Sequence, residues 1–422
     1  MKGLLAIVLT LSFFQTTAQI RKEDIYSDFV LYGKRQRLEK DLRENTIART
    51  FSQDLTKDNE HRFESACWAL AQFQFRNEKV EMGLGKLSAS YDSLEYDTKR
   101  AFLEAAYALY PTQYKERMHA LLQSETHPKL FAMQAVYLNR IDPSVEAQNE
   151  ILLRMVEQFP DYEQIPLLTA LQYYIQNDLS NRKKTSPSIK ELLSHYKKMG
   201  LKVVVSLQRW DRDQPGMAFI QNADGSIVRR ADGRPMLFEQ LARSGSALPY
   251  FLTNGNTPQG IYSITGTAVA HNNFIGPTPN LQMIMPFEDS LHRFYHFTKE
   301  PITDTLQAFM QLLPHSWRNY TPIKESYIAG KIGRTEIIAH GTTIDPEYFK
   351  DKPYYPLTPT LGCLCAKELW NVTSGKILVS EQYNLYSAFT STPGQKGLLL
   401  VINIDDQQKP VSREEVERIL QQ

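Results

Sequence analysis

The sequence predicts two domains: an N-terminal all-α domain resembling a short helical solenoid, and a mainly β C-terminal domain with a few helices. Three observations lead to this division. The chain has 422 residues, more than one small module needs. Apolar residues recur at helical spacing up to about residue 195 and in short strand-like runs after Gly200. The net charge of +1, with 23% charged and 42% hydrophobic residues, argues against disorder and coiled coils.

Residues 1–18 have the pattern of a cleavable secretory signal peptide. Lys2 provides a basic start, residues 3–14 are almost wholly apolar, and Ala18 closes a stretch of small residues. An apolar run of about a dozen residues is too short to span a bilayer, and no later run has 18 consecutive apolar residues. We therefore expect export to the periplasm or cell envelope, without stable membrane insertion.

Residues 19–199 form the predicted helical domain. Helix pairs separated by Pro-bearing turns, with helices at 114–122 and 145–159, are typical of solenoids, whose concave faces often bind partners. An envelope protein partner is one interpretation of this domain, and a plain scaffold or spacer is the other. Residues 178–188 are the predicted linker, and residues 189–198 form a further helix.

The predicted catalytic domain spans residues 200–405 and contains many strands. Many strands with few helices favour a β-sandwich or a barrel. Helices are predicted at 303–313 and 366–370, and a closing helix from Ser412 lies within the C-terminal segment 406–422. The predicted strands are 202–207, 217–221, 227–229, 260–265, 281–285, 335–339, 376–380 and 397–402.

Charge and cysteine content narrow the function classes. No basic cluster is longer than the three residues 182–184, so a nucleic-acid partner is not expected. The chain has 3 cysteines, an odd number that argues against a disulfide framework. Cys67 lies on an apolar helical face and is predicted to be buried. Cys363 and Cys365 need a separate explanation.

Cys363 has the surroundings of a nucleophile. Gly362 allows a close backbone approach to a substrate, and a helix beginning just after the cysteine would lower the pKa of the thiol and offer amides to an oxyanion. His340, at the end of a predicted strand and next to Gly341, is a candidate base. Their separation along the chain leaves open whether the two side chains meet.

Four segments in this order resemble the catalytic domain of the L,D-transpeptidase (YkuD-type) family. The resemblance covers about residues 201–405 and does not include the helical domain. The first segment, from Asn256 to Ile264, is similar to the Thr-Pro-x-Gly-x-Phe/Tyr-x-Ile strand of that family. The others are Met285-Pro286-Phe287, His340-Gly341-Thr342 and Thr360-Leu361-Gly362-Cys363-Leu364.

The resemblance implies a sandwich-like catalytic domain and a role for each matched residue. Cys363 would be the acylated nucleophile and His340 the general base and acid. The carbonyl of Gly341 would orient the imidazole, and the amide of Gly362 would contribute to the oxyanion hole. Thr360, Met285 and Phe287 would contact the substrate, and no cofactor or metal is implied.

The sequence also departs from the family pattern. Leu361 stands where the family commonly has His, and Cys365 stands where it has Arg or Asn. Residues 288–334 form an insertion whose predicted helix, 303–313, is amphipathic. We interpret that helix either as a lid over the donor groove or as an insertion without a role at the site.

The function implied is that of an exported L,D-transpeptidase. It would cross-link peptidoglycan stem peptides in cell-wall biogenesis and so affect cell shape. Two alternatives stay open: an L,D-carboxypeptidase that hydrolyses the same stems, and a catalytically decayed cell-wall binding module. A zinc site is disfavoured by the Cys-x-Cys spacing, and a papain-like protease by the order of Cys and His.

Overall fold

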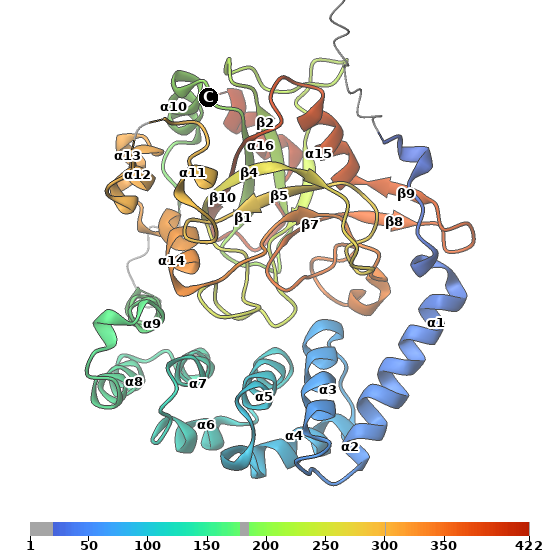
Figure 1. Cartoon of the computed structure of the whole chain (residues 1–422), viewed down its shortest axis with the longest axis vertical. Coiled ribbons are helices and arrows are strands. Elements are labelled where there is room, and N and C mark those ends of the chain that lie inside the picture. The colour runs from blue at the N-terminus through green and yellow to red at the C-terminus, as the bar shows by residue number, and fades with distance from the viewer. Residues whose placement is uncertain (1–19, 178–184, 300, 422) are drawn as a thin grey trace, which may run out of the picture.

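The computed structural model describes residues 20–177, 185–299 and 301–421. It shows a helical N-terminal region, from about residue 22 to 200, followed by a closed eight-stranded β-barrel with additional helices (Figure 1). The predicted signal peptide and residues 178–184 of the predicted linker lie outside the described residues. Among the helices that the structure describes, none has the length and apolar character needed to cross a membrane.

The helical region follows the predicted pattern of paired helices. The helices predicted at 114–122, 145–159 and 189–198 are found as α6, α8 and α10, within a residue or so at each end. The α-helices are α1 (Tyr32–Lys40), α2 (Thr50–Ser52), α3 (Glu60–Phe73), α4 (Glu78–Ala89), α5 (Tyr96–Leu109), α6 (Lys115–Leu122), α7 (Pro128–Ile141), α8 (Val145–Gln158), α9 (Pro166–Asn177) and α10 (Ile189–Met199). A π-type helix, η3 (Asp41–Arg49), joins α1 to α2.

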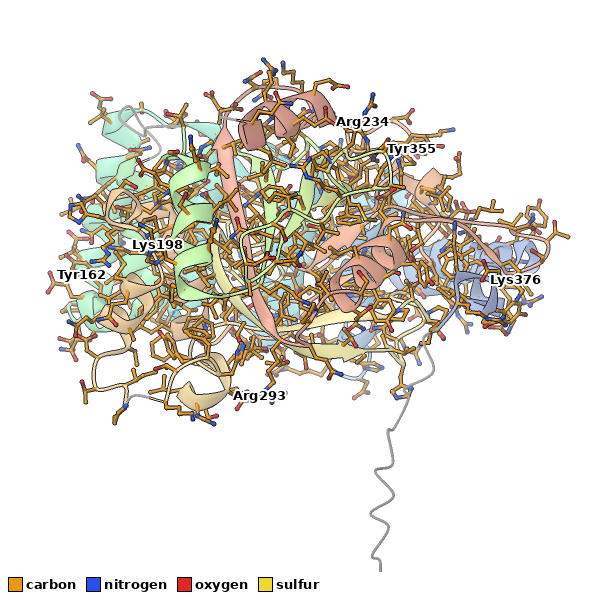
Figure 2. The ribbon with its side chains drawn as sticks, turned by 90° about the horizontal axis from the view of Figure 1, so that it is seen from above. Tyr162, Lys198, Arg234, Arg293, Tyr355 and Lys376 are labelled. Atoms are coloured by element: carbon orange, nitrogen blue, oxygen red, sulfur yellow. The ribbon has the colours of Figure 1, made fainter. Side chains whose placement is uncertain are left out.

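Polar caps and prolines set where these helices begin. The side chains of Asn77, Ser144 and Ser188 accept hydrogen bonds from amides in the first turns of α4, α8 and α10. Pro128 occupies the first turn of α7, where its missing N–H is not needed. The helices from α1 to α9 form an arc around one side of the barrel (Figure 1). Tyr162, between α8 and α9, and Lys376, beside β9, lie at opposite ends of the molecule (Figure 2).

The barrel has the strand order β1-β10-β4-β5-β6-β7-β3-β2. Strand β1 pairs in parallel with β10, and this pairing of the first and last strands closes the sheet. The remaining strands, β8 and β9, form a separate two-stranded ribbon. The strands are β1 (Val203–Arg209), β2 (Gly216–Gln221), β3 (Phe238–Leu241), β4 (Gly260–Ala268), β5 (Asn280–Ile284), β6 (Ala339–His340), β7 (Leu364–Ala366), β8 (Glu368–Trp370), β9 (Ile377–Ser380) and β10 (Gly397–Asp405).

The C-terminal region is thus a closed barrel and not the sandwich that the family resemblance implies. An alternating pattern of apolar residues defines the two faces of a strand but does not define its neighbours, so it fits a sandwich and a barrel equally well. The predicted strand 335–339 contributes only Ala339 to β6, and residues 227–229 form isolated bridges instead of a strand.

The helix predicted at 366–370 is wrong. Its residues form the end of β7 and all of β8. Ala, Lys, Glu and Leu favour helices locally, but pairing of β7 with β3 and of β8 with β9 overrides that preference. The closing helix is confirmed as α16 (Arg413–Gln421), with Ser412 accepting a hydrogen bond from the Glu415 amide.

Both faces of β1 are buried, which explains its continuous apolar run. Val204 belongs to one hydrophobic cluster with Leu399 of β10 and Tyr262 of β4. Val203 and Val205 belong to a second cluster on the other face, together with buried residues of the covering helices. Those helices are α10, α16 and three helices of the insertion: α11 (Leu291–Phe294), α12 (Thr305–Gln311) and α13 (His315–Arg318). The last helix of the insertion, α14 (Glu325–Ile332), packs on the first cluster through Ala329 and on the second through Tyr327.

The helical arc and the barrel share a hydrophobic cluster. Phe73, at the end of α3, contacts Phe274 and Tyr348 of the barrel region with ring centroids 5.9 and 5.0 Å apart. The side-chain amide of Gln72 donates to the carbonyl of Pro359 (3.3 Å). The first described residues also reach the barrel, where Ile25 packs in a small cluster with residues of β8 and β9. The two predicted domains are therefore joined by a common core, and residues 188–422 are not expected to fold alone.

We predict that Phe73→Ala destabilises both regions together. Phe73 is 1% exposed, and removal of a buried Phe side chain costs about 3–5 kcal/mol. Urea unfolding followed by far-UV circular dichroism and by tryptophan fluorescence should show one transition shifted to lower urea. Met82→Ala, at a 59% exposed position on α4, is the control and should leave the midpoint unchanged. Two separate transitions would contradict the shared core.

Candidate active site

A cavity of about 290 Å³ lies between α3 and one end of the barrel. Both chemically active side chains predicted from the sequence, Cys363 and His340, line it. Trp68 and Gln72 of α3 form part of its wall, and Phe274 lines it from the barrel region. The helical arc therefore contributes directly to the cavity that holds the thiol.

Strand pairing brings the cysteine segment to the histidine. Strands β6 and β7 run parallel, with Ala339 opposite Leu364 and His340 opposite Cys365. Cys363 lies in the turn immediately before β7, so this register puts its side chain at the same end of the barrel as His340. The sequence left this meeting open because 22 residues separate His340 from Cys363.

The imidazole of His340 is fixed by its neighbour. Its Nδ1 lies 2.5 Å from the carbonyl oxygen of Gly341. A carbonyl can only accept, so Nδ1 carries the proton and Nε2 is the basic nitrogen of the ring. Burial lowers the pKa of His340 to about 4, although the Gly341 carbonyl opposes this shift. The ring is neutral at neutral pH and able to take up a proton.

Threonine side chains hold the turn that carries the thiol. The Oγ1 of Thr360 accepts from the Gly362 amide (3.0 Å) and donates to the Cys363 carbonyl (2.9 Å). Thr257, from the first motif, donates to the Gly362 carbonyl (2.9 Å). Since the Gly362 amide already has this partner, an oxyanion would depend first on the amide of Cys363.

The thiol is partly buried and is protonated at neutral pH. Burial raises the pKa of Cys363 to about 11, and the Ile338 amide and the Arg334 guanidinium act in the opposite direction. The thiol donates to the carbonyl of Glu336 (3.3 Å), while its sulfur accepts from the Ile338 amide (3.5 Å). The sequence predicts that a helix following Cys363 lowers the pKa of the thiol. This prediction is wrong because a strand follows the cysteine.

Arg334, which lies under the cysteine turn, is a residue of the site that the sequence did not predict. Its guanidinium donates to the carbonyls of Gly255 (2.9 Å) and Asn256 (3.0 Å). A Cβ on Gly362 would lie 2.3 Å from its Nη2, and Gly362 has φ +122°, so only glycine fits there. Arg334 is the last residue of the predicted insertion, a place with no motif to mark it.

The predicted substrate-contacting residues are only partly brought together. Thr360 lines the cavity, but Met285 and Phe287 do not. Met285 is fully buried, and Phe287 is 41% exposed and packs on Tyr327 of α14. Leu361 lines the cavity, whereas Cys365 is buried, free of any disulfide, and in contact with the Thr358 hydroxyl (3.6 Å).

The predicted lid helix is not near the thiol. In α12, Phe309 is buried in the second hydrophobic cluster with Trp317 and the outer face of β1. No residue of α12 lines the cavity around Cys363. The amphipathic pattern correctly indicated a packed helix, but it could not indicate which surface that helix covers. Among the described residues, no group of three or more His, Cys, Asp or Glu side chains is placed to hold a metal ion.

Comparisons with protein families, with curated proteins and with solved structures find no match to this chain. The chemistry of the site is therefore inferred from its own residues: a partly buried thiol, a neutral imidazole with one basic nitrogen, and a guanidinium behind the cysteine turn. This set of groups is suited to nucleophilic catalysis by a thiol.

We predict that Cys363 is the cysteine alkylated in the native protein and that its rate follows the raised pKa. Cys67 and Cys365 are fully buried. Because the thiolate is the reactive form, the rate of reaction with iodoacetamide should rise with pH from neutral up to about pH 11. Peptide mass spectrometry locates the label, and Cys363→Ser is the control. A rate that levels off near neutral pH would contradict this prediction.

Proposed function

We propose that the protein is an exported L,D-transpeptidase acting on peptidoglycan stem peptides in the periplasm. The observation that carries the proposal is the cavity shared by Cys363 and His340, with the imidazole oriented by the Gly341 carbonyl. The four sequence motifs and their order supply the choice of family. On this proposal the barrel is the catalytic domain of that family, with the helical arc added to it.

The neutral state of both groups points to proton transfer during attack. His340 Nε2 takes the thiol proton as the sulfur attacks the carbonyl that precedes the terminal D-alanine. The imidazolium then gives this proton to the leaving amine, and the stem remains on Cys363 as a thioester. The family has a polar residue two positions after its nucleophile, and this chain has Cys365 at that position. Arg334, from another segment, supplies a guanidinium beside the cysteine turn.

The walls of the cavity favour an amine over water as the acceptor. Trp68 and Phe274 are apolar rings with centroids 6.1 Å apart, and both line the cavity with the thiol. An apolar wall excludes water from the thioester, so the thioester reacts with a bound amine instead. Hydrolysis of the same stems is the second candidate function, since it passes through the same thioester.

We predict that Cys363→Ala abolishes release of D-alanine from tetrapeptide-bearing fragments. His340→Ala should reduce it by several orders of magnitude, because the base and nucleophile act as a unit. Amino-acid analysis measures the release, and intact-stem mass spectrometry separates cross-linked from hydrolysed product. Cys365→Ser is the matched control and should keep most of the activity. Release by Cys363→Ala at a tenth of the parent rate would refute the mechanism.

We predict that Trp68→Ala weakens the use of stem substrates without changing the reactivity of the thiol. Loss of one aromatic contact should raise KM by roughly threefold to tenfold. The iodoacetamide rate at Cys363 should stay the same, because that reagent is too small to need the wall. Tyr32→Ala, at a 62% exposed position on α1, is the control. An unchanged KM would show that α3 does not contact the substrate.

A further inference from the structure

Behind His340 lies a buried carboxylate that the proposed mechanism does not use. Glu368 of β8 is 2% exposed, and its Oε1 accepts from the Ser380 hydroxyl (2.5 Å). Its Oε2 accepts from the Thr342 amide (2.8 Å). The β8–β9 ribbon thus directs a carboxylate at the loop that follows β6.

The two hydrogen bonds on this loop meet in a single peptide group. The carbonyl of Gly341 accepts from His340 Nδ1, and the N–H of Thr342 donates to Glu368. That carbonyl and that N–H belong to the one peptide bond between Gly341 and Thr342. An N–H that donates to a carboxylate polarises its peptide group and makes the carbonyl oxygen a stronger acceptor.

The packing requires glycine at position 341. A Cβ there would lie 2.1 Å from Cδ of Glu368 and 2.2 and 2.4 Å from its oxygens. Any side chain would push the carboxylate away from the peptide. The Thr342 carbonyl is held as well, by the indole N–H of Trp370 (2.8 Å). The loop is therefore fixed in the position that serves His340.

We propose that Glu368 is a positioning residue that acts on His340 through the Gly341–Thr342 peptide group. When His340 Nε2 takes the thiol proton, the S–H bond breaks and an N–H bond forms. The Nδ1 proton stays on Nδ1, and the polarised carbonyl stabilises the imidazolium. Glu368 accepts no proton in this step. The arrangement is a Cys–His–carboxylate triad with a peptide group between its second and third members.

The positioning role of Glu368 rests on the proposed function only for the identity of the reaction that His340 assists. Its first test therefore measures alkylation of the thiol and not the processing of stem peptides. Glu368→Gln keeps the side-chain shape and an acceptor for Thr342 but removes the charge. We expect the iodoacetamide rate at Cys363, measured above the Glu368 pKa of about 7 so that the parent carries the charge, to fall by about 10- to 100-fold, which is the loss in metal affinity or activity when a carboxylate behind a metal-bound histidine is removed. Glu381→Gln, at the start of α15 (Glu381–Thr390), is the matched control and should keep the parent rate.

Nitrogen-15 NMR of His340 provides a readout that a purely structural role would not move. In Glu368→Gln the Nδ1–H resonance should shift toward that of a weaker hydrogen bond, while the circular dichroism spectrum stays that of the parent. An unchanged resonance and an unchanged alkylation rate in a folded variant would overturn the proposal. If alkylation and NMR respond but no stem is processed, the proposed function fails and the positioning role stands.

A measurement on the unaltered protein covers the case in which the variant does not fold. Burial raises the pKa of Glu368 to about 7, against its hydrogen bonds from Ser380 and Thr342. The titratable groups near it on β6 and β7 are His340, with a pKa lowered to about 4, and Cys365, with a pKa raised to about 12. The His340 Nδ1–H resonance should therefore shift with a midpoint near pH 7, and a flat response across that range would overturn the proposal.

Discussion

The parallel pairing of β6 with β7 is the contact on which the candidate site depends. It consists of two residue pairs, Ala339 with Leu364 and His340 with Cys365, so it is too short to be stable alone. Neighbouring groups reinforce it: Thr257 and Thr360 hold the turn at the thiol, and Glu368 holds the loop after the imidazole. The position of each reactive group is thus determined by hydrogen bonds from other segments.

Burial gives the site its electrostatic character. It raises the pKa of the thiol and lowers that of the imidazole, so both groups are neutral at neutral pH. On the proposed mechanism, the charges formed during attack are stabilised by groups already in place. Arg334 near the sulfur and the Gly341–Thr342 peptide behind the imidazole are two such groups, and neither has to move.

The helical arc and the barrel form one structural unit around this site. Phe73 and Gln72 tie the end of α3 to loops of the barrel, and Trp68 on the same helix forms part of the cavity wall. The arc is therefore placed to influence which molecules reach the thiol, as well as to support the fold. The shared core explains why a boundary based on composition does not separate two independent domains.

The sequence by itself determined the helical region, most of the strands, and the identity of the thiol, the imidazole and the glycine that orients it. These features depend on local spacing, caps and motifs. Only the tertiary structure decided that β1 and β10 close a barrel, that residues 366–370 are strands, and that α12 packs away from the thiol. It also decided the positions of Arg334, Glu368 and Trp68, which come from separate segments. The physical reason is that strand neighbours, helix docking and the burial of a charge depend on residues far apart in the chain, for which a local pattern carries no signal.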